Sequence, residues 1–279
     1  MAEAAERHET TRKPVLYRLR GMKTAPVRRG IIYRTTASQA LTLDLYSPRK
    51  TTMRARRPAV VFVIGYADAG ARQRLGCAFK DMECYINWAQ LAAASGLVGV
   101  TYENEDPAAD VHAVLAYLHE HAAELGIDAE RIGIWACSGN APVALSTLLR
   151  DARTKVACAA FCYSLMLDVR GTQFVADAAN VFGFANPCAG KTVADLAPET
   201  PIFIARAGKD AVAHLNDTID AFVAAALEQN QPIALVNYDD GVLSFDLEQD
   251  TEMTRETIAR ILAFFRFNLL GATSPTEVR

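Results

Sequence analysis

The sequence predicts an α/β protein with a mostly parallel, doubly wound sheet of about eight strands and an antiparallel N-terminal edge. Short apolar runs, which are typical of buried parallel strands, alternate with segments of helical periodicity along most of the chain. Two segments with near-alternating apolar residues come first and are typical of edge strands. The chain shows no internal repeat, and the regular alternation of strands and helices favours one sheet covered on both faces.

The expected elements follow in order along the chain. The edge strands are expected at residues 30–33 and 41–46. The buried strands are expected at residues 59–64, 97–102, 132–136, 156–162, 201–205 and 233–236. Helices are expected at residues 81–95, 107–125, from 141 onward, 216–229 and 251–269. Gly126 ends the second of these helices as a C-cap residue.

The remaining segments define the domain organisation. Residues 1–30 are expected to form an N-terminal arm whose first 13 or so residues are disordered, and residues 31–270 the α/β domain. The arm is either a solvated leader or a contact in a homodimer. Residues 164–200 break the strand–helix rhythm with several glycines and prolines and three phenylalanines, which predicts a small cap or lid. Residues 271–279 form a polar tail.

Composition excludes several classes of protein. The net charge of −3 gives no attraction to nucleic acid or to a membrane surface, so we expect neither partner. The N-terminus lacks the apolar core of a secretory signal, and no run of about 18 apolar residues occurs. The six cysteines include no C-x-x-C pair and have no histidines at ligand spacing, so we expect no metal and no cofactor. We therefore expect a reduced, cytoplasmic protein.

Residues 131–150 combine a buried strand, a sharp turn at Ser138 and a helix that begins near Pro142. A serine on a strained strand-to-helix turn projects its hydroxyl above the sheet, and the N–H of the next residue, Gly139, can stabilise an oxyanion. The alternative is a plain helix with Ser138 as its N-cap. The strand before the turn and the apolar helix after it favour a nucleophile.

In a doubly wound sheet the functional site lies at the carboxyl ends of the strands. The loops expected there supply candidate residues for a substrate pocket, to which the cap segment adds an aromatic ring. These candidates are Gly65, Asp68, Glu103, Cys137, Tyr163, Asp168 and Phe182. The phenylalanines of the cap and the small net charge indicate a small, moderately apolar substrate.

The order and spacing of these motifs resemble the α/β-hydrolase family over roughly residues 31–270, and most closely its dienelactone-hydrolase and small-esterase branch. Residues 136–140 resemble the G-x-S-x-G nucleophile elbow, with small residues in place of both outer glycines. The resemblance implies that Ser138 is the nucleophile and that Asp210, in Ala-Gly-Lys-Asp, is the acid of a catalytic triad. It also implies that the backbone N–H of Tyr66, in the loop at residues 64–68, joins Gly139 in the oxyanion hole.

The sequence departs from the family at the catalytic histidine. Relatives carry this histidine in a G-x-H-x-F-type turn, which here reads Gly-Val-Leu-Ser-Phe, so Leu243 occupies its position. Leu243 is either natural or an introduced substitution. A serine hydroxyl needs an adjacent base because it is almost entirely protonated at neutral pH. Removing the histidine from a working triad cost roughly 10⁶ in kcat in a measured case.

Two kinds of substitute base are candidates. His214 follows Asp210 by four residues in a loop expected at the site edge, and its alternative role is that of a surface histidine. The carboxylates of the same loops are the second kind, since a carboxylate in an apolar pocket can have a raised pKa and act as a base. For Asp246, we favour a structural role in capping the last helix or ordering its loop.

Three functional hypotheses follow. The first is a serine-dependent hydrolase of small esters, lactones or thioesters with a degenerate triad. The second is a cofactor-free lyase, isomerase or cyclase on the same scaffold, with a carboxylate as base. The third is a catalytically inactive ligand-binding protein. Fold alone does not choose among them, since one fold supports many chemistries.

Overall fold

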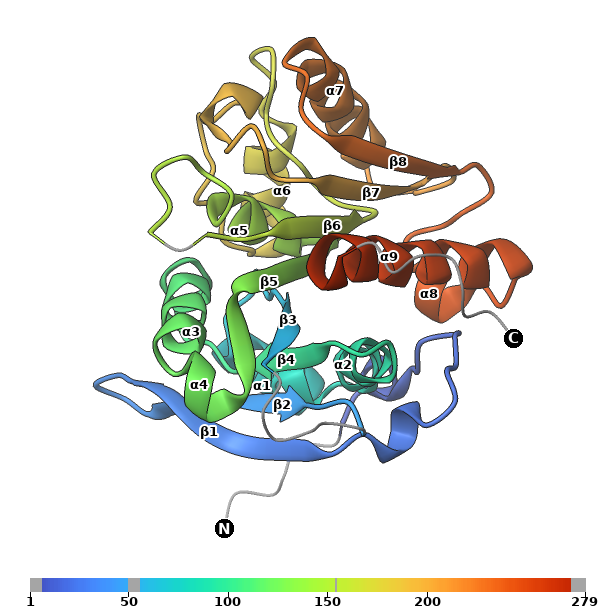
Figure 1. Ribbon diagram of the computed structural model, residues 1–279. Helices are drawn as coiled ribbons and strands as arrows, with labels where there is room; N and C mark the ends of the chain where they lie inside the picture. The colour runs from blue at the N-terminus through green and yellow to red at the C-terminus, as the bar shows by residue number, and fades with distance from the viewer. Residues whose placement is uncertain (1–6, 50–55, 154, 272–279) are drawn as a thin grey trace.

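The strands form an eight-stranded sheet in the order β1-β2-β4-β3-β5-β6-β7-β8 (Figure 1). A computed structural model describes residues 7–49, 56–153 and 155–271. β1 pairs with β2 and β2 with β4 in antiparallel fashion, and every other neighbouring pair in this sheet is parallel. The predicted fold class is therefore confirmed. The strands are β1 (Val27–Thr35), β2 (Ala40–Tyr46), β3 (Arg57–Phe62), β4 (Val98–Tyr102), β5 (Ile127–Cys137), β6 (Cys158–Cys162), β7 (Ile202–Ala207) and β8 (Ile233–Tyr238).

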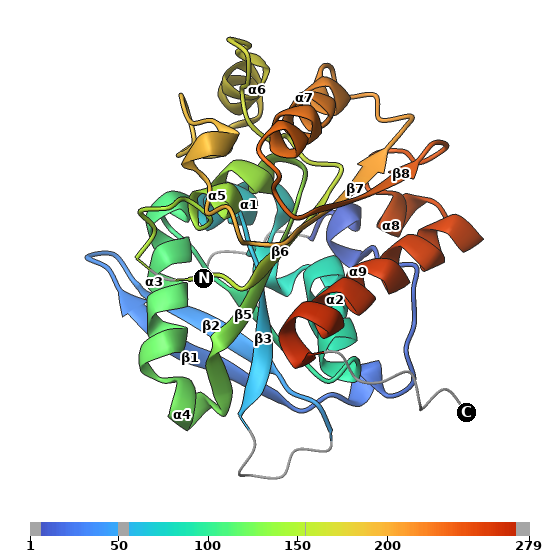
Figure 2. The same cartoon turned by 45° about the horizontal axis from the view of Figure 1, so that its top comes forward.

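Helices cover both faces of the sheet (Figure 2). One face packs against α2 and α9, and the opposite face packs against α3, α5 and α7, so the core is divided into two apolar clusters. The helices are α1 (Asp68–Leu75), α2 (Glu83–Ala94), α3 (Pro107–Glu120), α4 (Ala122–Leu125), α5 (Ala141–Ser146), α6 (Phe174–Phe182), α7 (Leu215–Glu228), α8 (Phe245–Glu248) and α9 (Glu252–Leu270).

The central strands are apolar on both faces because helices bury both sides of them. Every residue of β4 and β6 is buried. Small residues let the helices approach closely: a Cβ added at Gly99 would lie 2.5 Å from the carbonyl oxygen of Ala89 in α2. This burial explains why the strands appear in the sequence as continuous apolar runs.

Residues 7–17 pack on the domain, whereas the sequence predicted disorder through about residue 13. A 3-10 turn forms at Glu9–Arg12, and Thr11 within it is buried. The Leu16 N–H donates to the carbonyl oxygen of Asp246 at 2.7 Å, and Lys13 pairs with Glu248. This polar segment is ordered by hydrogen bonds rather than by apolar periodicity, so its composition did not reveal it. The predictions for residues 1–6 and 272–279 lie outside the described residues.

Other elements differ at their ends or were missed. β1 begins at Val27 rather than residue 30, and the helix expected at 107–125 divides at His121 into α3 and α4. α1 and α8 occupy segments that the sequence assigned to loops. α1 is rich in arginine and has no apolar face, and α8 has only four residues, so neither carries a helical periodicity.

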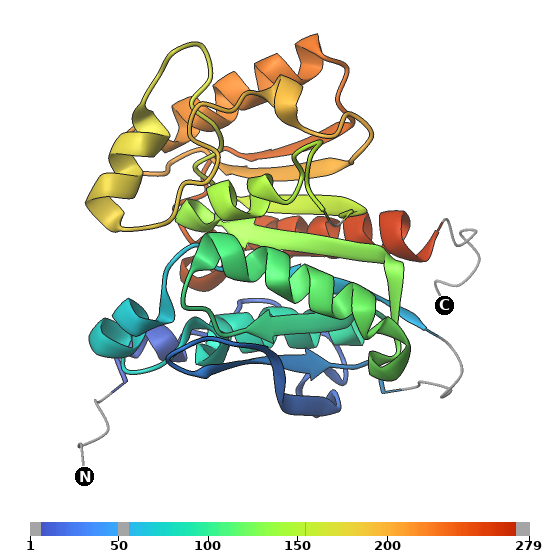
Figure 3. The same cartoon turned by 90° about the vertical axis from the view of Figure 1, so that its left-hand side faces the viewer.

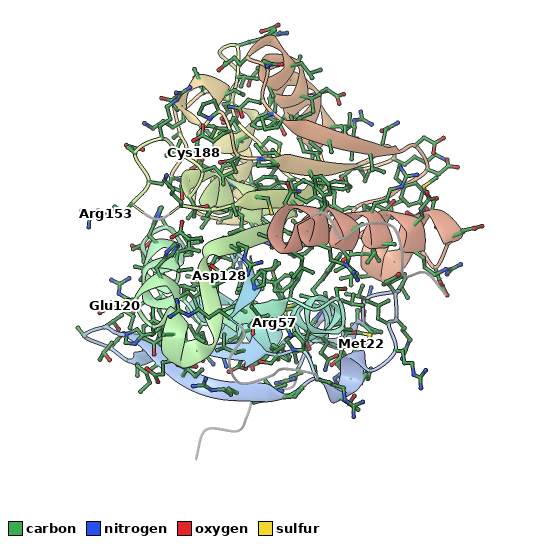
Figure 4. All side chains as sticks on the ribbon, in the orientation of Figure 1. Met22, Arg57, Glu120, Asp128, Arg153 and Cys188 are labelled. Carbon is green, nitrogen blue, oxygen red and sulfur yellow. The ribbon has the colours of Figure 1, made fainter. Side chains whose placement is uncertain are left out.

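Residues 164–200 fold against the elbow helix α5. The segment carries Cys188, which is labelled in Figure 4. Its thiol donates to the carbonyl oxygen of Pro142 at 3.2 Å, and a bridge joins Leu149 to Leu196. α6 also contacts the turn at Ser138–Asn140. Figure 3 shows α6 and α1 projecting from the same edge of the molecule, the edge at which the parallel strands end. Among the described residues, no helix is long and apolar enough to cross a membrane.

Candidate active site

Ser138 lies at the junction of strand and helix with a left-handed backbone, φ 51°. Cys137 before it is extended, and the 3-10 turn Ser138–Asn140 leads directly into α5. A positive φ is uncommon for serine and persists only where the surroundings enforce it. No side-chain cap occurs at the start of this turn or of α5, so the N-cap alternative for Ser138 is wrong.

The loop after β3 is fixed to this turn. The Gly65 N–H donates to the side-chain oxygen of Asn140 at 2.7 Å, and the Asn140 amide donates to the Tyr85 hydroxyl at 3.1 Å. A Cβ at Gly65 would lie 2.6 Å from the carbonyl oxygen of Gly139, so only glycine fits there. Asn140, unusual at this position of the elbow, thus ties two site loops together.

Two backbone N–H groups near Ser138 lack an acceptor. Among the backbone bonds of the described residues, the Tyr66 N–H has none. Gly139 is the second residue of its 3-10 turn, where the N–H groups have no partner within the turn. These are the two N–H groups for which the sequence predicts an oxyanion role.

Aromatic rings stand over Gly139. A Cβ at Gly139 would lie 2.5 Å from the Tyr66 hydroxyl and 2.6 Å from the Phe184 ring. Tyr66 and Phe184 also contact each other edge-to-face, with ring centroids 5.9 Å apart. The site wall from segment 164–200 is therefore Phe184, whereas Phe182 on α6 is 49% exposed. The composition of the cap segment could not show which of these two phenylalanines lines the site.

Asp210 has one carboxylate oxygen free. Its Oδ1 accepts from the Val212 N–H at 2.8 Å, and its buried Oδ2 has no hydrogen-bond partner among the described residues. Burial raises the pKa of Asp210, and the bond from Val212 offsets part of this rise. Backbone bonds hold its loop against the loop after β8, including one from the Lys209 N–H to the Gly241 oxygen at 2.7 Å.

Leu243 lies in that neighbouring loop. It is partly buried and packs against both apolar clusters of the core. Ser244 after it has a left-handed backbone, φ 57°, and α8 begins at Phe245. The leucine side chain has no group that could take a proton from Ser138.

No histidine of the described residues pairs with Ser138, whose hydroxyl forms no side-chain hydrogen bond within residues 7–49, 56–153 and 155–271. The His214 ring bonds to Asp217 at 2.8 Å and stacks on Phe174 with centroids 3.9 Å apart. This arrangement does not support His214 as the substitute base. His112 approaches Ser146 at 3.3 Å, in a surface cleft on the α3 and α5 face.

Two of the predicted pocket carboxylates have structural partners. Glu103 accepts bonds from Thr42 and Arg72. Burial alone would raise the pKa of Glu103, but these bonds lower it overall. Asp168 accepts the N–H groups of Val175 and Ala176 in the first turn of α6. Neither environment is that of an unpaired base.

Asp68 joins two loops. It is buried, and its carboxylate accepts the N–H groups of Phe79 and Asn104, both at 2.9 Å. Burial raises the pKa of Asp68 to about 6, and the two backbone bonds oppose the rise. Asp68 therefore fixes the start of α1 against the end of β4.

Cys137 and Tyr163 line one pocket together with Asp246. The Tyr163 hydroxyl donates to Asp246 at 2.6 Å, and the Trp88 indole N–H donates to the other carboxylate oxygen at 2.9 Å. Burial raises the pKa of the Cys137 thiol to about 12, so this thiol stays protonated at neutral pH. The predicted structural role of Asp246 fits these bonds, but Thr251, not Asp246, caps α9.

No group of three histidine, cysteine or carboxylate side chains in the described part of the chain is arranged to hold a metal ion. The six cysteines are free thiols.

Comparison with solved structures identifies similar folds. Esterase 2 of the planctomycete Thermogutta terrifontis is similar in its native form, with a TM-score of 0.66 and 18% identity over 92% of this chain and 96% of that chain. The same esterase phosphonylated by sarin has a TM-score of 0.65 and 17% identity over 91% of this chain and 98% of that chain. Its propionate-bound form has a TM-score of 0.63 and 18% identity over 88% of this chain and 96% of that chain. No protein-family model and no curated protein sequence matches the chain.

The strand order, the elbow between β5 and α5 and this likeness together define the fold as that of the α/β-hydrolases. At 18% identity the likeness concerns the fold, and the chemistry of the site has to be argued from its residues.

We predict that ionisation of Asp68 opposes folding. Its pKa is raised above the unfolded value of 3.8 to about 6, so the folded protein binds more protons between about pH 4 and 6, and stability is lost as pH rises through this window. Unfolding free energies from urea titrations at pH 4 to 7 measure this for wild type and Asp68→Asn. The unfolding free energy of the wild type minus that of the variant should fall by roughly 3 kcal/mol as the pH rises from about 4 to about 6. A difference that stays constant with pH would contradict the assignment.

Proposed function

We propose that the protein is a serine-dependent hydrolase of small esters, lactones or thioesters whose catalytic triad lacks its base. One observation carries the proposal: Ser138 has φ 51° at a strand-to-helix junction, and no side-chain bond of the described residues holds its hydroxyl. Strain of this kind is retained at functional sites. The esterase likeness of the fold and the resemblance to the dienelactone-hydrolase and small-esterase branch support the same chemistry.

The reaction begins when the Ser138 oxygen attacks the substrate carbonyl. The carbonyl π electrons move onto oxygen, and the N–H groups of Gly139 and Tyr66 stabilise this oxyanion. Collapse of the tetrahedral intermediate breaks the bond to the leaving oxygen or sulfur, which takes a proton from water and becomes the alcohol or thiol. Water then attacks the acyl-serine, the acid is released, and the Ser138 oxygen regains a proton. The serine proton passes to water, since the neighbouring loop offers Leu243 in place of a base. Turnover is therefore slow and favours substrates with good leaving groups.

Asp210 supports the degenerate triad. In the family this acid accepts a hydrogen bond from the histidine, and here its buried Oδ2 has no partner among the described residues. A buried acceptor without a donor is uncommon because it loses its hydrogen bonds to water. The free oxygen matches the place left by an imidazole N–H.

The free Oδ2 of Asp210 also favours a second candidate function, in which Asp210 acts as a base. Because burial raises the pKa of Asp210, its carboxylate is suited to take a proton from a substrate carbon. A lyase, isomerase or cyclase could combine this base with the two oxyanion donors and form no acyl-serine. The third hypothesis, an inactive binding protein, is an outcome of the tests below.

We expect Ser138→Ala to abolish the hydrolysis of a short-chain p-nitrophenyl ester, because no other group is placed to attack. Ser146→Ala is the matched control, since Ser146 is the serine that contacts a histidine, 3.3 Å away. Release of p-nitrophenol by the purified proteins, above the rate in buffer, measures both. Full activity in Ser138→Ala, or its loss only in Ser146→Ala, would be evidence against the proposal.

We expect Leu243→His to raise kcat for the same ester by about 10²- to 10⁴-fold, the usual contribution of a general base. The new imidazole would use the free Oδ2 of Asp210, so the double variant Leu243→His with Asp210→Asn should lose most of the gain. Activity of the single variant should rise with pH as the imidazole loses its proton near pH 6.5. A folded Leu243→His protein without any gain would show that the geometry has also diverged.

A further inference from the structure

A pocket of about 170 Å³ lies beside the elbow, on the face of the sheet that packs against α2 and α9. An engineered apolar cavity of about 150 Å³ holds benzene, so this pocket of about 170 Å³ has room for about seven non-hydrogen atoms. Cys137 and Asn140, on either side of Ser138, contribute to its lining, but Ser138 does not. The pocket is thus adjacent to the proposed ester site and distinct from it.

Aromatic rings dominate the walls. Trp88 and Trp135 lie with ring centroids 4.9 Å apart, and Tyr85 meets Trp135 edge-to-face at 6.4 Å. The aromatic residues that line the pocket are Phe79, Tyr85, Trp88, Trp135 and Tyr163. Groups of aromatic rings attract organic cations through the negative faces of the rings.

Asp246 supplies the only carboxylate among the lining residues. It is 2% exposed, and its two oxygens accept one bond each from Tyr163 and Trp88, both neutral donors. Burial raises the pKa of Asp246, and the hydrogen bonds from Tyr163, Trp88 and its own backbone N–H offset part of this rise. No lysine, arginine or histidine of the described residues pairs with Asp246, and Lys13 pairs with Glu248. A buried carboxylate without a cation is unfavourable, and a bound cation would relieve this.

We propose that this pocket binds a small organic ammonium ion, which pairs with Asp246 and contacts the surrounding aromatic rings. The pocket volume limits the ligand to about the size of choline. The carboxylate of Asp246 repels an organic anion, and a neutral molecule leaves this carboxylate without a positively charged partner. The proposal goes beyond ester hydrolysis and does not depend on Ser138 as a nucleophile.

The N-terminal segment contributes one residue to the wall of this pocket. Thr10 lines the pocket, and the Leu16 N–H holds the backbone of Asp246. The Lys13–Glu248 pair joins the same segment to α8 at an exposed position. The N-terminal segment and the elbow thus both contribute residues to this pocket.

The chain contains two tryptophans, and both line this pocket, so intrinsic fluorescence reports on its occupancy. The probes are choline and dimethylbutanol, its neutral isostere with carbon in place of nitrogen. We expect a saturable fluorescence change with choline and at least about tenfold weaker binding of the isostere. Equal binding of the two, or no saturable change with choline, would overturn the proposal without the need for any variant.

Three variants test whether the ligand binds beside Asp246. Asp246→Asn should remove the preference for choline over its isostere, whereas Glu248→Gln, a neighbouring exposed carboxylate, should keep it. Ser138→Ala should bind choline like wild type, which separates failure of this proposal from failure of the proposed hydrolase. A folded Asp246→Asn protein that still prefers choline would contradict the role of Asp246.

Discussion

The hydrogen bond from the Gly65 N–H to the Asn140 side chain is the interaction on which the candidate site depends. It holds the loop after β3 against the turn after β5, and the two proposed oxyanion donors belong to these two segments. The approach is close enough that a Cβ at Gly65 would meet the backbone of Gly139 and Asn140. The left-handed backbone of Ser138 is enforced by this packing and by the strand and helix on either side. A site of this geometry therefore follows from backbone contacts as much as from the identity of the serine.

The candidate site combines Ser138, the proposed nucleophile, and Asp210, the proposed acid, with no histidine bonded to either of them among the described residues. Asp210 keeps a buried carboxylate oxygen unpaired, although an unpaired buried acceptor destabilises a protein. Leu243, at the sequence position where the resemblance places the histidine, packs against the core from the loop after β8. His214, which was the best substitute in the sequence, is instead held by Asp217 and Phe174. These contacts agree with the proposal of a hydrolase whose catalytic triad lacks its base.

Sequence patterns predicted the sheet because its parallel strands are buried on both faces and appear as continuous apolar runs. They also located Ser138 and Asp210, whose positions follow from strand ends. They missed α1 and α8, which have no apolar periodicity, and the packing of residues 7–13, which depends on side-chain and backbone hydrogen bonds with distant partners. The pairing of Asp246 with Trp88 and Tyr163 joins residues up to 158 positions apart, so no local pattern could indicate it. The sequence could not show which of Phe182 and Phe184 lies at the elbow. The position at which α6 ends decides this, because Phe182 is the last residue of α6 and Phe184 follows the helix.

The most direct test of the central claim is labelling of the folded wild-type protein with a fluorophosphonate, followed by intact and peptide mass spectrometry. We expect one adduct per chain, located at Ser138, absent in Ser138→Ala and formed slowly because no base activates the hydroxyl. A folded protein that stays unlabelled, or that is labelled at a residue other than Ser138, would contradict the claim that this turn presents a nucleophile.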